Sequence, residues 1–181
     1  MKLLLCMLLI FNVMASKKVL MKTSMGDITI ELNEEKAPIT TKNFLSYVND
    51  GFYNGTIFHR VIDNFMIQGG GFDINLKKKS TKASIVNEAH NGLKNDQGTI
   101  AMARTSDVNS ATAQFFINVN DNTFLNHKGK SPDKYGYAVF GKVVKGMSII
   151  NQIKKTQTKV NGPMRNLPVK NVVIEKVSVV K

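Results

Sequence analysis

The sequence predicts a mainly β domain, an antiparallel barrel or sandwich with two helices packed against it. Short runs of β-branched and aromatic residues recur along the chain, and clusters of Gly, Asn and Asp separate them. Apolar residues follow helical spacing in only two places, so strands and helices do not alternate as they do in parallel βαβ units. The 181 residues, 43% of them hydrophobic, fit one domain with a substantial core.

A β-hairpin and a helix are the first elements expected. Apolar and polar residues alternate over residues 19–23 and 28–32, and a short segment with a Gly-Asp pair joins them, which is typical of a hairpin. Pro38 is tolerated in the first turn of a helix, and Phe44 belongs to an apolar set at helical spacing. Gly51 ends that run.

The rest of the chain predicts further strands and a second helix. The helix follows Gly146, where Met147, Ile150 and Ile153 recur at helical spacing. Residues 69–97 and 121–134 are expected to be long irregular loops, and such loops are often functional. Strands are expected at residues 58–62, 65–68, 99–103, 115–119, 137–143 and 172–180.

Residues 1–15 predict a cleaved export signal. Lys2 supplies the positive start, residues 3–13 are apolar, and small residues follow. The apolar run is about half the ~20 residues that a membrane-spanning helix needs; a buried first helix is the alternative. Cleavage would remove Cys6, the only cysteine, and leave a thiol-free chain suited to an oxidising compartment. We therefore expect residues 16–181 to form a single exported domain, periplasmic in a bacterium, with no stable membrane anchor.

Composition and motifs exclude several kinds of chemistry. The net charge is +12, but the lysines are dispersed, which favours a solvated surface over a specific nucleic-acid groove. His59, His90 and His127 are far apart and form no metal motif. The glycines at 69–71 lack the spacing of a phosphate-binding loop and predict a bend or a close backbone approach. We expect no metal and no cofactor.

Some residues have purely structural interpretations. His59 is expected to be a hydrogen-bonded residue of its strand. Glu88 is a candidate to brace the long loop, although the sequence does not decide its role. Alternating strand positions predict four core residues: Phe58, Ile62, Phe115 and Ile117.

Three blocks of sequence resemble the cyclophilin family of peptidyl-prolyl cis/trans isomerases. Residues 58–70 read FHRVIDNFMIQGG, residues 114–118 read QFFIN, and residues 137–143 read YAVFGKV, in the family's order. The resemblance extends from about residue 19 to the C-terminus. It implies an eight-stranded antiparallel β-barrel closed by two α-helices, with its active face on the outside. It also implies faster rotation about Xaa-Pro bonds, with proline-containing polypeptides as substrates.

The resemblance also assigns the site. Arg60 would be the catalytic residue, an apolar wall would hold the proline ring, and two glutamines would hold the substrate backbone. The implied substrate-binding residues are Phe65, Met66, Gln68, Ala103, Arg104, Gln114, Phe116, Phe124, Leu125 and Tyr137.

The chain departs from the better-known eukaryotic pattern of the family. Phe124 replaces a tryptophan that helps to bind cyclosporin, so weak inhibition by that drug is expected. Tyr137 replaces a histidine and Arg104 replaces an asparagine. Together with Gly71, these choices resemble the bacterial exported (periplasmic) branch.

Two other functions remain open from the residues alone. The barrel could be a binding module that binds proline-containing segments without isomerising their Xaa-Pro bonds, although the Arg60 block argues against this. The positive surface could adhere to anionic polymers, which would make binding steeply dependent on salt. A monomer is the default expectation.

Overall fold

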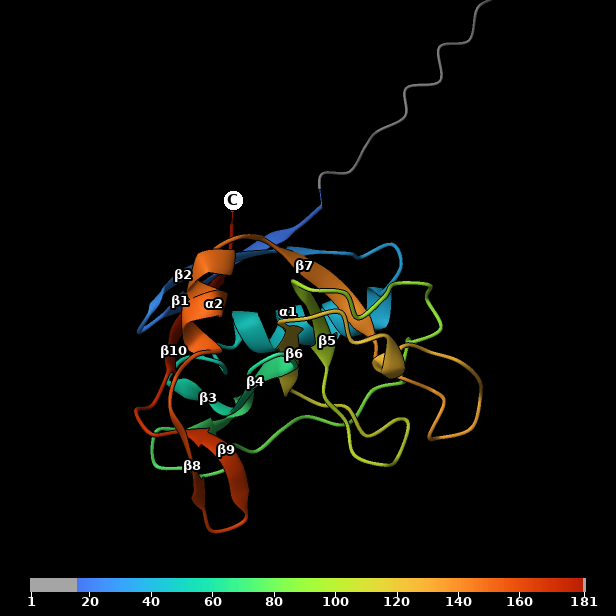
Figure 1. Ribbon diagram of the computed structural model, residues 1–181. Helices are drawn as coiled ribbons and strands as arrows, with labels where there is room; N and C mark the ends of the chain where they lie inside the picture. Colours follow the sequence, from blue (N-terminus) through green and yellow to red (C-terminus); the bar gives the residue numbers. More distant parts are fainter. Residues whose placement is uncertain (1–15, 181) are drawn as a thin grey trace, which may run out of the picture.

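Eight strands close into one antiparallel barrel. The computed structural model describes residues 16–180, and the strands follow one another around the barrel in the order β1-β10-β3-β4-β6-β5-β7-β2 (Figure 1). This confirms the predicted barrel and its two helices. The barrel strands are β1 Lys18–Thr23, β2 Gly26–Leu32, β3 Thr56–Ile62, β4 Met66–Asp73, β5 Thr99–Met102, β6 Phe115–Asn118, β7 Val139–Lys145 and β10 Val173–Val179.

Three kinds of element lie outside the barrel strands. The helices α1 Pro38–Asn49 and α2 Met147–Ile153 contribute buried side chains to the core, among them Phe44 and Ile150. A 3-10 turn, η1, spans Thr123–Leu125. Strands β8 Thr158–Asn161 and β9 Met164–Pro168 form a separate hairpin that projects from the barrel (Figure 1). No helix within residues 16–180 has both the length and the apolar character needed to cross a membrane.

Side chains on the inner face of the barrel form its core. Phe44 of α1 packs with Tyr53, Phe115 and Phe140 at ring-centroid distances of 5.1–5.8 Å. Because successive residues of a strand point to opposite faces, the strand neighbours of inward residues such as Phe115 point outward. The outward residues of β4, β5 and β6 therefore belong to a different surface.

Glu88 caps the start of α1 from the distant loop. Its carboxylate accepts hydrogen bonds from the N–H groups of Ile39 (3.1 Å) and Thr40 (2.7 Å) and from the Thr40 hydroxyl (2.6 Å). Ala37, at the N-cap position, provides no side-chain cap. Since the first N–H groups of a helix have no partner within the helix and attract negative charge, a buried carboxylate 48 residues away in the chain supplies what the helix lacks locally.

The structure corrects three sequence-based expectations. The β8–β9 hairpin was not predicted. The loop expected from residue 69 begins later, because β4 continues through the three glycines to Asp73. Ile62 is not a core residue: the strand pairing shifts between Phe58 and Arg60, and Ile62 is half-buried on the outer surface. Phe58, Phe115 and Ile117 are fully buried, as predicted.

Candidate active site

Neighbouring strands bring the predicted site residues into one row. In the antiparallel register Arg60 of β3 lies opposite Gln68 of β4, Gln68 lies opposite Phe116 of β6, and Phe116 lies opposite Ala101 of β5. Residues directly opposite one another across strands have neighbouring side chains. The side chains of Arg60, Gln68 and Phe116 are therefore neighbours, although up to 56 positions separate these residues in the chain.

An apolar cluster extends from this row over the outside of the barrel. We call it the outer apolar cluster. Its buried members alternate with core residues along their strands, as Met66 does with Ile67 and Phe116 with Phe115 and Ile117. The buried members are Met66, Ala101, Phe116 and Val139, and the partly buried members are Ile62, Phe65, Leu93, Ala103, Leu125 and Tyr137.

The outer apolar cluster contains six of the residues that the sequence analysis assigned to substrate. It adds four that the motifs did not indicate: Ile62, Leu93, Ala101 and Val139. Ala101 and Val139 lie opposite each other in the β5–β7 pairing. The alternation of strand residues around the known blocks could have indicated these two, whereas Leu93 comes from the irregular loop.

Polar side chains form hydrogen bonds with one another along one edge of the outer apolar cluster. Gln68 Nε2 donates a hydrogen bond to Gln114 Oε1 (2.9 Å), and Arg60 Nη1 donates to Gln68 Oε1 at 3.5 Å, a long contact. The Arg60 guanidinium carbon lies 5.8 Å from the centre of the Phe65 ring. Gly71 leaves the space that Gln114 occupies, because a Cβ there would come within 2.6 Å of its side chain. The site thus places a cation beside an apolar surface.

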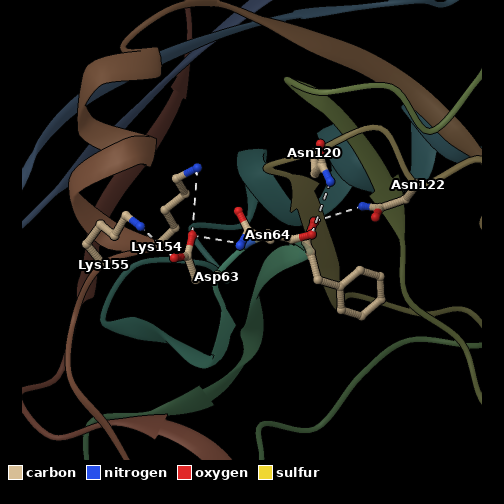
Figure 2. Close-up of polar contacts among 7 residues, drawn as sticks. Asp63, Asn64, Asn120, Asn122, Lys154 and Lys155 are labelled. Carbon is tan, nitrogen blue, oxygen red and sulfur yellow. Dashed lines mark hydrogen bonds and ion pairs between the residues drawn. The ribbon is translucent and has the colours of Figure 1, made fainter.

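The turn between β3 and β4, which precedes Phe65, is bonded to two other parts of the chain. Lys155 and Lys154 pair with the Asp63 carboxylate at 2.6 and 3.7 Å, and that carboxylate also accepts a hydrogen bond from the N–H of Asn64 (Figure 2). The Lys155 ammonium is the main cause that lowers the pKa of Asp63. Figure 2 shows Asn120 reaching the same turn from the other side; its amide donates to the Asn64 carbonyl at 3.4 Å.

Arg104 and Phe124 lie in different surroundings. Arg104 donates hydrogen bonds to the carbonyls of Gly136 and Pro132 (3.0 Å each), and its guanidinium lies 4.8 Å from the Tyr137 ring centre. This geometry makes Arg104 a clamp on the loop before β7, and its contact with substrate stays a prediction. Phe124 is 62% exposed and stacks on Phe65 at 5.5 Å.

His59 is buried in β3, next to Arg60 in the sequence. It is 7% exposed, and its Nδ1 has no hydrogen-bond partner within residues 16–180. Burial is the main cause that lowers the pKa of His59, to about 4; the charge of Arg60 adds to the shift, while the Ile57 carbonyl and the Gln114 amide oppose it. The imidazole is therefore neutral in the folded protein at neutral pH.

We expect His59 to make the protein less stable in mild acid. An unfolded histidine gains a proton below its ordinary pKa of 6.5, whereas folded His59 does so only near 4. The unfolded state then binds more protons between these values, and the free energy of unfolding falls as pH decreases. Between pH 7 and pH 5 the loss is about 2 kcal/mol. Denaturant titrations of wild type and His59→Gln at several pH values measure this loss. Equal slopes of the free energy of unfolding against pH in the two proteins would contradict the assignment of the effect to His59.

The described part of the chain offers no metal centre. Within residues 16–180, no group of three or more His, Cys, Asp or Glu side chains could hold a metal ion. His90 and His127 lie together beside Tyr135, with their ring centres 6.2 Å apart.

Comparisons with known proteins identify the family. The sequence model described as "Cyclophilin type peptidyl-prolyl cis-trans isomerase/CLD" matches residues 18–179. The chain belongs to this family. Peptidyl-prolyl cis-trans isomerase A of Dickeya dadantii is 54% identical over 171 residues, which cover 94% of this chain and 88% of the relative. Peptidyl-prolyl cis-trans isomerase B of Escherichia coli is 56% identical over 157 residues, or 87% and 96% of the two chains.

A solved structure supports the same assignment. A crystal structure of a cyclophilin-type isomerase from Cryptosporidium parvum matches with a TM-score of 0.75 and 26% identity, and covers 92% of this chain and 98% of its own. A second crystal structure, of the same description and in the presence of the dipeptide Ala-Pro, matches with 27% identity and a TM-score of 0.75. The protein is thus a cyclophilin-type peptidyl-prolyl isomerase, and the row on β3, β4, β6 and β5 is its candidate active site.

Proposed function

We propose that this cyclophilin assists the folding of exported proteins by turning Xaa-Pro bonds at the outer apolar cluster, with Arg60 as the catalytic residue. The observation that carries the site assignment is the Arg60 guanidinium beside the apolar surface, with its carbon 5.8 Å from the Phe65 ring centre. The Ala-Pro dipeptide of the Cryptosporidium parvum structure supports a proline-containing substrate. The substrate's proline ring rests on Phe65, Met66 and Phe116.

The reaction requires no acid, base or nucleophile. Rotation about an amide is slow because the nitrogen lone pair is delocalised, with a barrier of about 18–20 kcal/mol. The enzyme accelerates it by favouring the twisted amide over both planar forms. A rate gain on the order of 10⁵ requires about 7 kcal/mol.

Arg60 supplies an interaction that only the twisted state can use. When the amide twists, the proline nitrogen becomes pyramidal and regains a lone pair that can accept a hydrogen bond. A guanidinium is always charged and presents fixed donors, so Arg60 binds this nitrogen most strongly at the transition state. The outer apolar cluster excludes water, which strengthens that contact. Gln68 accepts a long hydrogen bond from Arg60, at 3.5 Å.

A refolding assay tests the activity against the alternative of a passive binding module. The isomerase should accelerate the slow, proline-limited phase of an unfolded client, which otherwise takes tens to hundreds of seconds. Binding of a proline peptide without acceleration would favour the passive module. Binding that disappears with added salt and is indifferent to Arg60→Ala would favour adhesion to anionic polymers.

We expect exported material to begin near residue 16. The apolar run at residues 3–13 supports a signal peptide, and residues 1–15 lie outside the described residues. N-terminal sequencing of protein from the exported fraction of the producing cells measures the start directly. A chain that retains Met1 and stays with the cytosolic fraction would overturn the export proposal without affecting the isomerase activity.

A further inference from the structure

Three asparagines are buried between the strands and the loops around the active site. Asn95, Asn118 and Asn122 are 1%, 0% and 2% exposed. Asparagine is mostly exposed in proteins, and burying an amide costs free energy unless its hydrogen bonds are replaced. The partners of these amides therefore show what the burial achieves.

The three side chains form a chain of amides that runs in one direction. Asn122 Nδ2 donates to Asn118 Oδ1 at 2.7 Å, and Asn118 Nδ2 donates to Asn95 Oδ1 at 3.2 Å. Asn118 Nδ2 also donates to the Thr99 hydroxyl at 2.9 Å. The backbone N–H of Asn122 donates to the Asn95 carbonyl at 2.8 Å, which closes the connection. The amides thus link the start of β5, the end of β6 and the approach to η1.

Both ends of this chain donate to the backbone of the outer apolar cluster. At one end Asn122 Nδ2 donates to the Phe65 carbonyl at 2.8 Å. At the other end Asn95 Nδ2 donates to the carbonyls of Leu125 at 3.2 Å and Tyr137 at 3.4 Å. All three acceptors are members of the outer apolar cluster. The amide chain therefore joins opposite sides of the same surface.

The three acceptor residues need such support because none lies inside a barrel strand. Phe65 comes just before β4, Leu125 ends η1, and Tyr137 precedes β7. They also make backbone bonds outside regular strand pairing. The N–H of Phe65 donates to the Ile62 carbonyl and that of Leu125 to the Asn122 carbonyl, while the Phe65 and Leu125 carbonyls accept from the N–H groups of Val119 and Tyr137. Regular strand pairing does not set their spacing, so the buried amides have a direct influence on it.

We propose that Asn95, Asn118 and Asn122 are positioning residues, which hold Phe65 and Leu125 at the separation that a proline ring requires. They touch no substrate themselves. The inference rests on the proposed use of the outer apolar cluster as the proline site. A preorganised surface binds a ring without the free-energy cost of ordering its own residues first. Loosening the residues that support the surface therefore weakens binding.

The test replaces Asn122 with alanine, which removes both of its side-chain donors. We expect KM for an Ala-Pro tetrapeptide to rise about tenfold, with kcat within about twofold of wild type, because the Arg60–Gln68 contact does not pass through the amides. Backbone amide NMR signals of Phe65 and Leu125 should broaden. Asn122→Ser retains one hydroxyl donor and should give an intermediate KM; it also serves if the alanine variant does not fold.

Two control variants separate positioning from simple loss of stability. Asn120→Ala removes an exposed neighbour on the same segment whose side chain, within residues 16–180, bonds only the Asn64 carbonyl, and should leave KM unchanged. Ile28→Val in β2 lowers stability by deleting a core methyl group and should also leave KM unchanged. A fall in melting temperature with no rise in KM for either Asn122 variant would overturn the inference.

A third variant distinguishes this failure from failure of the proposed site. Phe116→Ala removes a buried member of the outer apolar cluster directly. If Phe116→Ala raises KM and the Asn122 variants do not, only the positioning role is refuted. If Phe116→Ala, like the Asn122 variants, binds and turns over the peptide as wild type does, the proline ring rests elsewhere. Both proposals are then refuted.

Discussion

Replacing Arg60 with alanine is expected to lower kcat/KM for Xaa-Pro isomerisation by a factor of about 100 to 1,000. Removing one preorganised hydrogen-bond donor that faces a developing lone pair or charge typically lowers the rate by a factor of this size. The fold should be unaffected, because Arg60 is half-buried on the outside of the barrel and, among the described residues, its side chain makes one long hydrogen bond, to Gln68. The measurement is NMR exchange on an Ala-Pro tetrapeptide, with thermal unfolding as the check on folding.

Arg60→Lys is the matched control for charge. Lysine retains the positive charge but lacks the fixed, planar set of donors. We expect it to recover only a minor part of the lost activity, because geometry as well as charge is needed to reach a pyramidal nitrogen. Turnover within about threefold of wild type in Arg60→Ala would refute the catalytic assignment. Full recovery in Arg60→Lys would reduce the role of Arg60 to that of a simple charge.

The parts of the site that the sequence predicts are those encoded in contiguous blocks. Residues 58–70 carry Arg60, Phe65 and Met66 within seven positions, and strand alternation assigns their faces. Ile62 was misassigned because a shift in strand pairing beside Phe58 changes the alternation, and nothing in the residue types announces that shift.

The remaining features depend on polar contacts between distant segments. Asn95 and Asn118 are 23 residues apart, and an asparagine in a loop usually indicates a turn rather than a buried amide. The β8–β9 hairpin was missed for a related reason: β8 is mostly exposed along both faces, so its residues show no alternation of apolar and polar types. Such contacts become visible only once the barrel places the segments side by side.

Replacing Glu88 with alanine is expected to lower the free energy of unfolding by about 3 to 4 kcal/mol. The substitution leaves the N–H and the hydroxyl of the fully buried Thr40, and the N–H of the partly exposed Ile39, without their acceptor at the start of α1. Each unsatisfied buried group costs about 1–3 kcal/mol, part of which water entering the space recovers. For a domain of this size the melting temperature should fall by about 10 °C. Denaturant unfolding and calorimetry measure both quantities.

Glu175→Ala is the control for Glu88, because Glu175 is exposed on β10 and its loss should change stability by no more than about 0.5 kcal/mol. Glu88→Gln should lie between the two, since the amide retains one acceptor but loses the charge that the helix N-terminus favours. Well below its melting temperature, Glu88→Ala should retain kcat/KM within about threefold of wild type, because α1 contributes nothing to the outer apolar cluster. A stability loss equal to that of Glu175→Ala would show that solvent satisfies the start of α1 as well as Glu88 does, and the cap would then have no role in holding the long loop to the helix.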